Sequence, residues 1–433
     1  MRIYFENNLT QQKRLALLRR ASSSRADTAA AVREICLAVK QRGDTAVRAY
    51  SRKFNKTDVP VARLSQKEFQ SAKRSLSPTI RGALRVAINN IRVFHESQMN
   101  RTRRITTMEG VHCWREARPI ERVGLYIPAG SAPLPSTVLM LGIPAVLAGC
   151  PRIVLCSPPQ KNGSVDPIIL AAASLVGLDE GYNVGGAQAI AAMAYGTDTI
   201  PKVDKIFGPG NRFVAAAKQF VSNDPDGAAM DLLAGPSEVL ILADETANPE
   251  IVAYDMISQA EHDADAQAVL VTTSNLLAKE VLRILPQKAK EFSRKKIIKS
   301  ALNHSYIVIA DSRASAIRFS NDYAPEHLII NMKNAKSVVP RITHAGSVFV
   351  GPYAPVPAGD YASGTNHTLP TSGTARRVSG ISVDSFQKNI AFQSITKSGL
   401  QNLEPALSTF ASVEGLHAHA RAVTSRLSKV WLK

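Results

Sequence analysis

The sequence predicts an α/β protein in which parallel sheets are covered by helices on both faces. From Arg122 onward, short apolar runs alternate with stretches of helical periodicity, and several of these runs are β-branched and lie beside Gly or Pro. Before residue 105 and after about Ser382, the pattern is helical throughout. We therefore expect a helical N-terminal region and a helical C-terminal tail on either side of an α/β centre.

The N-terminal quarter predicts four helices, because its apolar residues recur at helical spacing and Gly43 separates the second helix from the third. The expected helices span Thr10–Arg20, Thr28–Gln41, Asp44–Phe54 and Pro78–Gln98.

The central part predicts eight strands, which could form one large sheet or two smaller ones. Gly-Pro turns and the region of Ser237 offer a division between two α/β units. The expected strands are Arg122–Ile127, Arg152–Cys156, Lys205–Phe207, Val239–Ala243, Ala268–Thr272, Tyr306–Ala310, Leu328–Asn331 and Ser347–Val350. Between them, helices are expected at Ser136–Ala148, Ala187–Tyr195, Asn211–Ser222 and Pro249–Glu261.

The charge is concentrated near the N-terminus. Residues 1–104 hold 23 Lys and Arg against 7 Asp and Glu, whereas the net charge of the whole chain is +18. Such an excess is compatible with a nucleic-acid or acidic-membrane surface. We favour a solvated helical face, because no aromatic residues are interleaved with the basic ones as stacking platforms.

No apolar run approaches the roughly 18 residues that a membrane span needs, so we expect no membrane partner. The basic, Ser-rich N-terminus lacks the apolar core of a secretory signal, although a transit peptide remains an alternative. The four cysteines form no CxxC pair and no disulfide framework. Reduced, mostly buried thiols in a cytoplasmic protein are therefore expected.

Three glycine-rich turns follow predicted strands within one α/β unit. They read Ile127-Pro-Ala-Gly-Ser-Ala-Pro, Val184-Gly-Gly-Ala-Gln and Phe207-Gly-Pro-Gly-Asn. In doubly wound folds, ligands bind where strands end, and glycines there let backbone N–H groups approach a phosphate. A GxGxxG fingerprint is missing, and each turn alone is more simply structural. Together they favour a nucleotide-like ligand.

Short polar segments predict a second site in the later part of the chain. Gln259 and His262 lie one turn apart on a predicted helix, and His262, His419 and Asp360 are ligand types that suit Zn²⁺, although Gln is an unusual ligand. Glu326 and His327 follow a proline, so that either could be a general base or simply belong to an exposed helix start. The loop Gly359–His367 and the pair Glu414 and His419 complete this set, although the C-terminal helix could equally have only a docking role.

The chain resembles the histidinol dehydrogenase family over nearly its whole length. The residues that carry the resemblance are Arg122-Val-Gly-Leu-Tyr-Ile-Pro, Asn183-Val-Gly-Gly-Ala-Gln-Ala-Ile, Lys205-Ile-Phe-Gly-Pro-Gly-Asn, Ala234-Gly-Pro-Ser-Glu-Val, Gln259-Ala-Glu-His, Pro325-Glu-His-Leu and Gly359-Asp-Tyr-Ala-Ser-Gly-Thr-Asn-His. The resemblance implies two NAD-dependent oxidations that convert L-histidinol to L-histidine. Glu326 and His327 would be the catalytic bases.

The resemblance also implies the binding residues. Zn²⁺ would be held by Gln259, His262, Asp360 and His419. Positions that match substrate contacts are Ser237, Gln259, His262, His327, Asp360, Tyr361, His367, Glu414 and His419. Positions that match NAD contacts are Tyr126, Gln188 and Asn211, which lie at the three glycine-rich turns.

The implied architecture is two incomplete Rossmann-like parallel-sheet domains in an intertwined homodimer. We expect an N-terminal helical extension over 1–25, a first domain built from 26–121 with 239–381, an NAD-binding domain over 122–238 and a helical, dimer-swapped tail over 382–433. Oxidation of other small alcohols is a rival activity, but Glu414, His367 and His419 favour histidinol. A basic nucleic-acid-binding module and a non-catalytic scaffold are disfavoured rivals.

Overall fold

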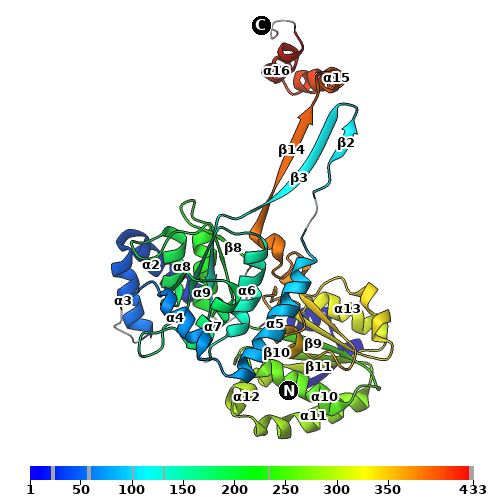
Figure 1. Cartoon of the computed structure of the whole chain (residues 1–433). Coiled ribbons are helices and arrows are strands. Elements are labelled where there is room, and N and C mark those ends of the chain that lie inside the picture. The colour runs from blue at the N-terminus through cyan, green and yellow to red at the C-terminus, as the bar shows by residue number, and fades with distance from the viewer. Residues whose placement is uncertain (21–24, 56–59, 100–101, 130–131, 233–234, 429–433) are drawn as a thin grey trace. The chain divides into compact units, whose positions relative to one another are not determined.

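The computed structural model describes residues 1–20, 25–55, 60–99, 102–129, 132–232 and 235–428. The chain forms two compact units (Figure 1). The first comprises Met1–Gln98 with Ile120–Phe386, and the second comprises Met99–Pro119 with Gln387–Lys433. The α/β class is confirmed, because the first unit contains two separate parallel sheets with helices on both faces.

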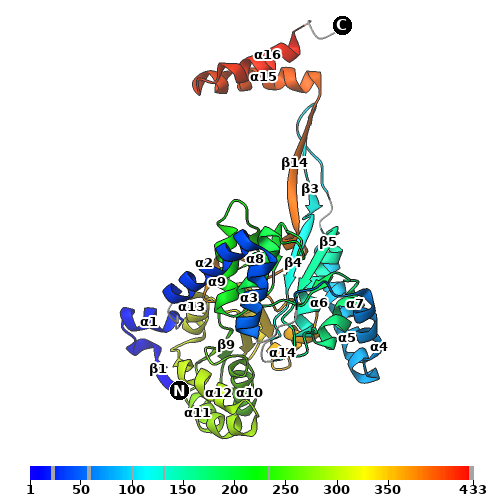
Figure 2. The same ribbon diagram turned by 90° about the vertical axis from the view of Figure 1, so that its left-hand side faces the viewer.

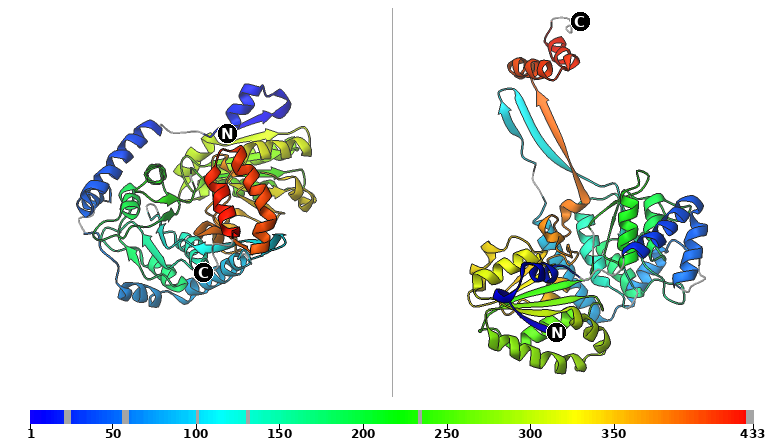
Figure 3. Two further views of the ribbon diagram at one scale, coloured as in Figure 1. Left: turned by 90° about the horizontal axis from the view of Figure 1, so that it is seen from above. Right: turned by 180° about the vertical axis from the view of Figure 1, so that it is seen from behind.

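The larger parallel sheet of the first unit has six strands in the order β1-β11-β10-β9-β12-β13. Odd-numbered residues of β9, such as Ile241, pack with α10, α11 and α12, whereas Leu240 and Leu242 pack with α1 and α13 on the opposite face. Figures 1 and 3 show helices on both faces of this sheet. The strands are β1 (Arg2–Phe5), β9 (Glu238–Ala243), β10 (Gln267–Thr272), β11 (Tyr306–Ile309), β12 (His327–Asn331) and β13 (Ser347–Val350), and the helices are α1 (Gln11–Leu18), α10 (Pro249–Ala260), α11 (Asn275–Lys288), α12 (Lys295–His304) and α13 (Arg313–Tyr323).

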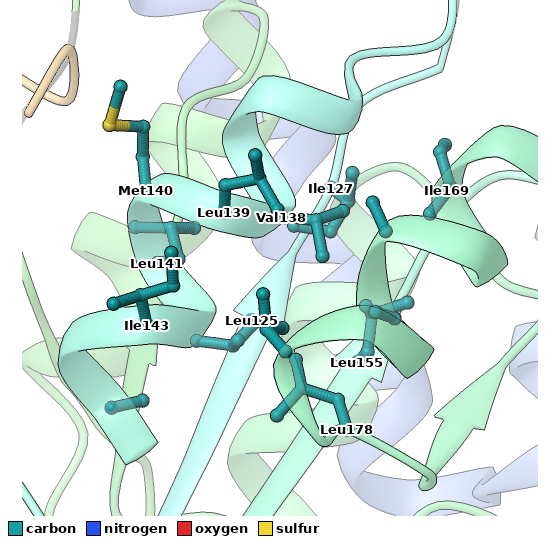
Figure 4. Packing of buried hydrophobic residues seen from close by; sticks show 14 of the residues in the cluster. Leu125, Ile127, Val138, Leu139, Met140, Leu141, Ile143, Leu155, Ile169 and Leu178 are labelled. Carbon is teal, nitrogen blue, oxygen red and sulfur yellow. The ribbon is translucent and has the colours of Figure 1, made fainter. Parts of the chain in front are cut away.

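The smaller parallel sheet has five strands in the order β6-β5-β4-β7-β8. Leu125, Ile127 and Leu155 meet the apolar residues of α6 and α7 on one face (Figure 4), and α8 and α9 cover the other face. The strands are β4 (Arg122–Tyr126), β5 (Arg152–Cys156), β6 (Gly181–Tyr182), β7 (Lys205–Phe207) and β8 (Ala229–Met230), and the helices are α6 (Pro135–Leu147), α7 (Pro167–Val176), α8 (Ala187–Tyr195) and α9 (Arg212–Ser222).

The N-terminal helices belong with the smaller sheet. Val32, Cys36 and Val47 share a core with Ile190 of α8, while Phe69 and Ile91 share one with α6 and α7. Figure 2 shows these helices beside α6, α7, α8 and α9. The expected grouping of 26–121 with 239–381 is therefore wrong for these helices, since their apolar faces are buried on 122–238. They are α2 (Arg25–Arg42), α3 (Asp44–Asn55), α4 (Gln66–Arg74) and α5 (Pro78–Glu96).

The expected purely helical extension over 1–25 is also wrong at its start. Residues Arg2–Phe5 form β1, which pairs in parallel with β11 at the edge of the larger sheet. Short 3-10 helices lie at Glu6–Asn8, Ala289–Glu291, Ala335–Ser337, Val339–Arg341, Thr374–Arg376 and Val383–Phe386.

The second unit is a three-stranded antiparallel sheet in the order β14-β3-β2, followed by two helices (Figure 1). The purely helical tail expected over 382–433 is corrected here, because β14 forms a nine-residue ladder with β3. The elements are β2 (Ile105–Met108), β3 (Val111–Pro119), β14 (Gln387–Ile395), α15 (Lys397–Val413) and α16 (His417–Leu427).

None of the described helices combines the length and the apolar character that a membrane span would require. The four cysteines are free thiols, as expected, and Cys36, Cys150 and Cys156 are buried.

Candidate active site

Glu326 and His327 lie where β12 begins, beside the start of the neighbouring strand β9. Their side chains are buried, with 4% of each residue exposed. The His327 ring approaches the Glu326 carboxylate, with 3.5 Å between Nδ1 and Oε2. Its Nδ1 also lies 3.2 Å from the main-chain oxygen of Glu238. Because a carbonyl oxygen only accepts, this contact favours the tautomer with hydrogen on Nδ1 and leaves Nε2 as the basic atom.

Asp360 lies on the other side of the imidazole, near the end of α14 (Val356–Tyr361). Its Oδ1 is 3.6 Å from Nε2 of His327, and its Oδ2 is 3.9 Å from Nε2 of His262. Burial opposes protonation of His327, but the Glu326 and Asp360 carboxylates outweigh it and raise the pKa of His327 to about 10. Burial likewise opposes ionisation of Asp360, and the His327 ring overrides it and lowers the pKa of this carboxyl.

Gln259 lies in the last turn of α10 and is 1% exposed. Among the described residues, neither its side-chain oxygen nor its side-chain nitrogen finds a hydrogen-bond partner. Buried amides are almost always hydrogen-bonded, so this one is suited to an added ligand. His262 follows just after the helix and is exposed. Amide oxygen, imidazole nitrogen and carboxylate oxygen from Gln259, His262 and Asp360 fit a divalent metal such as Zn²⁺.

The other predicted substrate positions in the first unit lie close to this group in the chain or in space. Ser237 directly precedes β9 and is partly buried, and Tyr361 follows Asp360 with 58% of its surface exposed. Burial lowers the pKa of His367, although the nearby Asp360 carboxylate acts in the opposite direction. The structure therefore brings His367 near the charges of Asp360 and His327.

The loop that carries His367 is held by the helices α5 and α6. Asn366 donates from Nδ2 to the main-chain oxygen of Met140 at 2.6 Å, and the same atom lies 3.3 Å from Nε2 of the fully buried His95. The side chain of Asn90 donates to the main-chain oxygen of Ala362. Helices packed on the smaller sheet thus support a site on the larger one.

Glu414 and His419 belong to the second unit. Glu414 is the residue after α15, His419 lies in α16, and both are exposed. The structure thus does not join these two residues to the cluster around Asp360 within one unit. The four expected zinc positions are split accordingly, with three in the first unit and one in the second.

The glycine-rich turns meet around Tyr126, which ends β4. Its hydroxyl accepts a hydrogen bond from the main-chain N–H of Gly186 at 3.1 Å. A Cβ on Gly208 would lie 2.1 Å from the main-chain oxygen of Tyr126, so the β7 turn packs directly on β4. This point is where the strand order reverses between β4 and β7, which is the usual ligand position in such sheets.

The two other predicted NAD positions flank this point at the starts of helices. Gln188 is buried in the first turn of α8, and its Nε2 has no hydrogen-bond partner among the described residues. Asn211 caps α9 by accepting hydrogen bonds from the N–H groups of Phe213 and Val214. Gly130 and Ser131 of the first predicted turn lie outside the described residues.

Several residues that support the site were not predicted from the sequence. Glu238 and Asn366 lie inside the motifs that carry the family resemblance, so the sequence held a clue to them. Arg20, His95 and Lys218 lie outside those motifs. Lys218 is 2% exposed, forms an ion pair with Asp231 and donates to the main-chain oxygen of Gly208, and therefore fixes the β7 turn.

Comparisons with known proteins identify the family. The family model described as histidinol dehydrogenase matches residues 18–427. A histidinol dehydrogenase of Vibrio parahaemolyticus is 48% identical over 431 residues, covering 99% of each chain, and one of Bacteroides fragilis is 49% identical over 399 residues, covering 92% of this chain and 93% of that protein. The crystal structure of histidinol dehydrogenase from Elizabethkingia anophelis superposes with a TM-score of 0.94 at 48% identity, covering 99% of this chain and 98% of that one. The chain is an oxidoreductase that belongs to the histidinol dehydrogenase family.

Proposed function

We propose that this oxidoreductase converts L-histidinol to L-histidine in two successive oxidations, with NAD as hydride acceptor and Zn²⁺ as its metal. These would be the last steps of histidine biosynthesis. The observation that carries the proposal is the arrangement around His327, whose Nδ1 faces a carbonyl oxygen while Nε2 points toward Asp360. Family membership over almost the whole chain supports the substrate assignment.

Gln259, His262, Asp360 and His419 would hold the zinc. When bound, the ion would anchor the imidazole and amino groups of the substrate beside the nicotinamide. Positive charge at Asp360 would also lower the pKa of His327 toward neutrality, which a general base requires. Ser237, Tyr361, His367 and Glu414 would contact the substrate, whereas Tyr126, Gln188 and Asn211 would contact NAD.

In the first oxidation, Nε2 of His327 would accept the hydroxyl proton of histidinol while the carbon-bound hydrogen leaves as hydride to NAD. The aldehyde product would remain in the site, where the buried surroundings limit side reactions. In the second oxidation, Glu326 would take a proton from the water that adds to the aldehyde carbon. The second hydride would then leave from the hydrated carbon to a new NAD, giving the carboxylate.

The active form would be an intertwined homodimer in which Glu414 and His419 of one subunit complete the site of the other. The exposed position of both residues in a separate unit supports this arrangement. A cytoplasmic location, which four free thiols favour, stays a prediction.

The test is the amount of NADH formed from a limiting amount of L-histidinol, before and after chelation of the metal. Two NADH per histidinol, lost on chelation and restored by zinc, are expected. One NADH would mean that the aldehyde escapes and would remove the proposed role of Glu326. No NADH would overturn the substrate assignment. His327→Asn is the matched control, because it should lose activity while still binding zinc.

A further inference from the structure

Glu238, the first residue of β9, is 1% exposed and forms a reciprocal pair with Glu326. The main-chain N–H of Glu238 donates to Oε2 of Glu326 at 2.8 Å, and the main-chain N–H of Glu326 lies 3.3 Å from Oε1 of Glu238. Each carboxylate is therefore oriented by the backbone of the other strand. Two buried carboxylates this close together repel each other unless a cation compensates one of them.

Arg20 provides that compensation from the N-terminal segment. Its guanidinium forms a bidentate pair with Glu238, with Nε to Oε2 at 2.6 Å and Nη2 to Oε1 at 2.7 Å. The plane lies over the ring of Tyr323, 3.6 Å from its centre, and Nη2 also donates to the main-chain oxygen of Tyr323. The Arg20 side chain is only 12% exposed. The planar guanidinium group of arginine, with its five N–H donors, is suited to such a buried bidentate contact with a carboxylate.

We propose that Arg20 and Glu238 are positioning residues that hold the Glu326 carboxylate in the direction needed for the second oxidation. The inference rests on the proposed function, in which Glu326 activates the water that attacks the aldehyde. Neither Arg20 nor Glu238 needs to touch substrate. Their role is to fix the contact between the starts of β9 and β12.

The charges that face Glu326 explain why the effect should be selective. Glu238 lies on β9 and pairs with Arg20, whose guanidinium lies over the ring of Tyr323. On the other strand, His327 contacts both Glu326 and Asp360, and His367 is close enough to feel the charge of Glu326. Removing Arg20 would leave Glu238 as an uncompensated buried carboxylate directly beside Glu326. His327 is less exposed to this change, because its Nδ1 is held by a main-chain oxygen and its Nε2 faces Asp360. The first oxidation should therefore suffer less than the second.

The experiment compares Arg20→Met with Arg14→Met in the full-length, zinc-loaded enzyme. Arg14 is a matched control, because it also pairs with carboxylates, those of Glu6 and Asp322, and lies over an aromatic ring, yet it does not contact Glu238. Hydride transfer from L-histidinol is measured in a single turnover, and oxidation of L-histidinal is measured with the aldehyde supplied directly. Zinc content and the KM for NAD are recorded for every variant.

Arg20→Met should slow the oxidation of histidinal by about 100-fold, the cost of a catalytic group misplaced by about 1 Å. Hydride transfer from histidinol should fall by less than about 5-fold, because the His327 contacts remain. The double variant Arg20→Met with Glu238→Gln should recover about 10-fold of the loss, since it no longer buries an unpaired carboxylate. Arg14→Met should change neither half-reaction selectively.

Equal losses in both half-reactions, or matching profiles for Arg20→Met and Arg14→Met, would overturn the positioning role in an enzyme that is otherwise active. If Arg20→Met does not fold, Arg20→Lys keeps the charge but loses the fork. A smaller slowing that still affects histidinal oxidation more than histidinol oxidation is then expected, because the charge stays and only the bidentate contact is lost. The absence of any selective slowing would also overturn the inference. A wild-type enzyme that oxidises neither histidinol nor histidinal would instead refute the proposed function, and the inference with it.

Discussion

The side-chain amide of Gln259 is buried without a hydrogen-bond partner among the described residues. An unsatisfied buried amide costs about 1–3 kcal/mol of folding free energy. We predict that Gln259→Leu leaves the thermal stability of the metal-free protein unchanged or raises it, and abolishes the additional stabilisation that zinc provides. Unfolding curves recorded with chelator and with zinc would test both parts.

Gln267→Leu is the matched control for this substitution. Gln267 is also buried, but its amide donates to the main-chain oxygen of His304 and accepts from the hydroxyl of Tyr323. Gln267→Leu should therefore destabilise the metal-free protein by about 1–3 kcal/mol, because it leaves the partners of the Gln267 amide unpaired. If Gln259→Leu were equally destabilising without zinc, the glutamine would have a structural role and the metal assignment would lose its support.

Asp255 makes stability depend on pH. Its carboxyl lies on α10 at a cavity of about 330 Å³ that is lined mainly by apolar residues such as Ile251 and Ile329, and burial raises its pKa to about 7. The pKa of Asp255 in the folded protein therefore lies above its value of about 3.9 in the unfolded chain. As the pH rises from about 4 to about 7, the free energy of unfolding falls, and above pH of about 7 it falls no further on account of this group.

We therefore predict that Asp255→Asn stabilises the protein at pH 8, by roughly 1–2 kcal/mol after allowance for partial exposure, and has little effect near pH 4. Thermal unfolding of the variant and the wild-type protein over this pH range measures the difference in stability. Glu245→Gln, which changes an exposed carboxyl, should show no such dependence. A variant that is equally stabilised at both pH values would contradict the titration of Asp255.

At the residue scale, the sequence identified the groups that carry the proposed chemistry but not the residues that hold them. Glu326, His327 and Asp360 stand in dense polar motifs. In the structure, the His327 ring lies 3.5 Å from the Glu326 carboxylate and 3.6 Å from that of Asp360, which in turn lies 3.9 Å from His262. The partnership of Glu238 with Glu326 joins positions 88 apart in the chain. Arg20 reaches Glu238 across 218 positions. Such contacts arise only from the sheet order, which no local pattern encodes.

Among the elements, the turn after β7 leaves no room for a side chain at Gly208. Gly208 has φ +125°, and an added Cβ would lie 2.1 Å from the main-chain oxygen of Tyr126. Two backbone segments cannot both remain in place at that distance. We predict that Gly208→Ala raises the KM for NAD at least about 10-fold by displacing the turn, as a shift of about 1 Å at a binding group would. Zinc content should stay unchanged.

Gly149→Ala is the control for Gly208→Ala. Gly149 also has a positive φ, of +81°, but a Cβ there would meet nothing within 4 Å. It should cost about 1 kcal/mol of stability through backbone strain alone and leave the KM for NAD as it is. Equal KM values for both variants would mean that the β7 turn does not contact the cofactor.

Most of the strands that the sequence predicted share one physical feature. All eight expected strands were confirmed within a residue or two, and apart from β13 they are largely buried on both faces, which gives them continuous apolar runs. Six described strands were not predicted. β1, β2, β3 and β14 are partly or largely exposed and show no clear alternation, and β6 and β8 are only two residues long. The sequence also could not predict which sheet α2–α5 pack against, because an amphipathic face shows that a helix is partly buried but not which element covers it.

At the scale of the whole molecule, the second unit buries little of its own apolar surface. Within α15 only Gly399 and Ala411 are buried, and α16 buries none of its described residues. Leu407, Phe410, Val413 and Leu416 are all exposed, with Phe410 at 68% and Val413 at 81%. A soluble chain rarely leaves such a contiguous apolar stripe uncovered, which favours a second subunit as its partner.

A mixing experiment tests whether that partner completes the site. We predict that His327→Asn and His419→Asn are each inactive alone, but that subunit exchange between them restores about a quarter of wild-type activity. Random pairing makes about half of the dimers mixed, and each mixed dimer has one site with an intact His327 and an intact partner tail. If each tail served its own subunit, every site would carry one defect and the mixture would stay inactive. The control is a mixture of His327→Asn with Glu326→Gln, which both alter the first unit, so that no site can complete both oxidations and no histidine should form in either case.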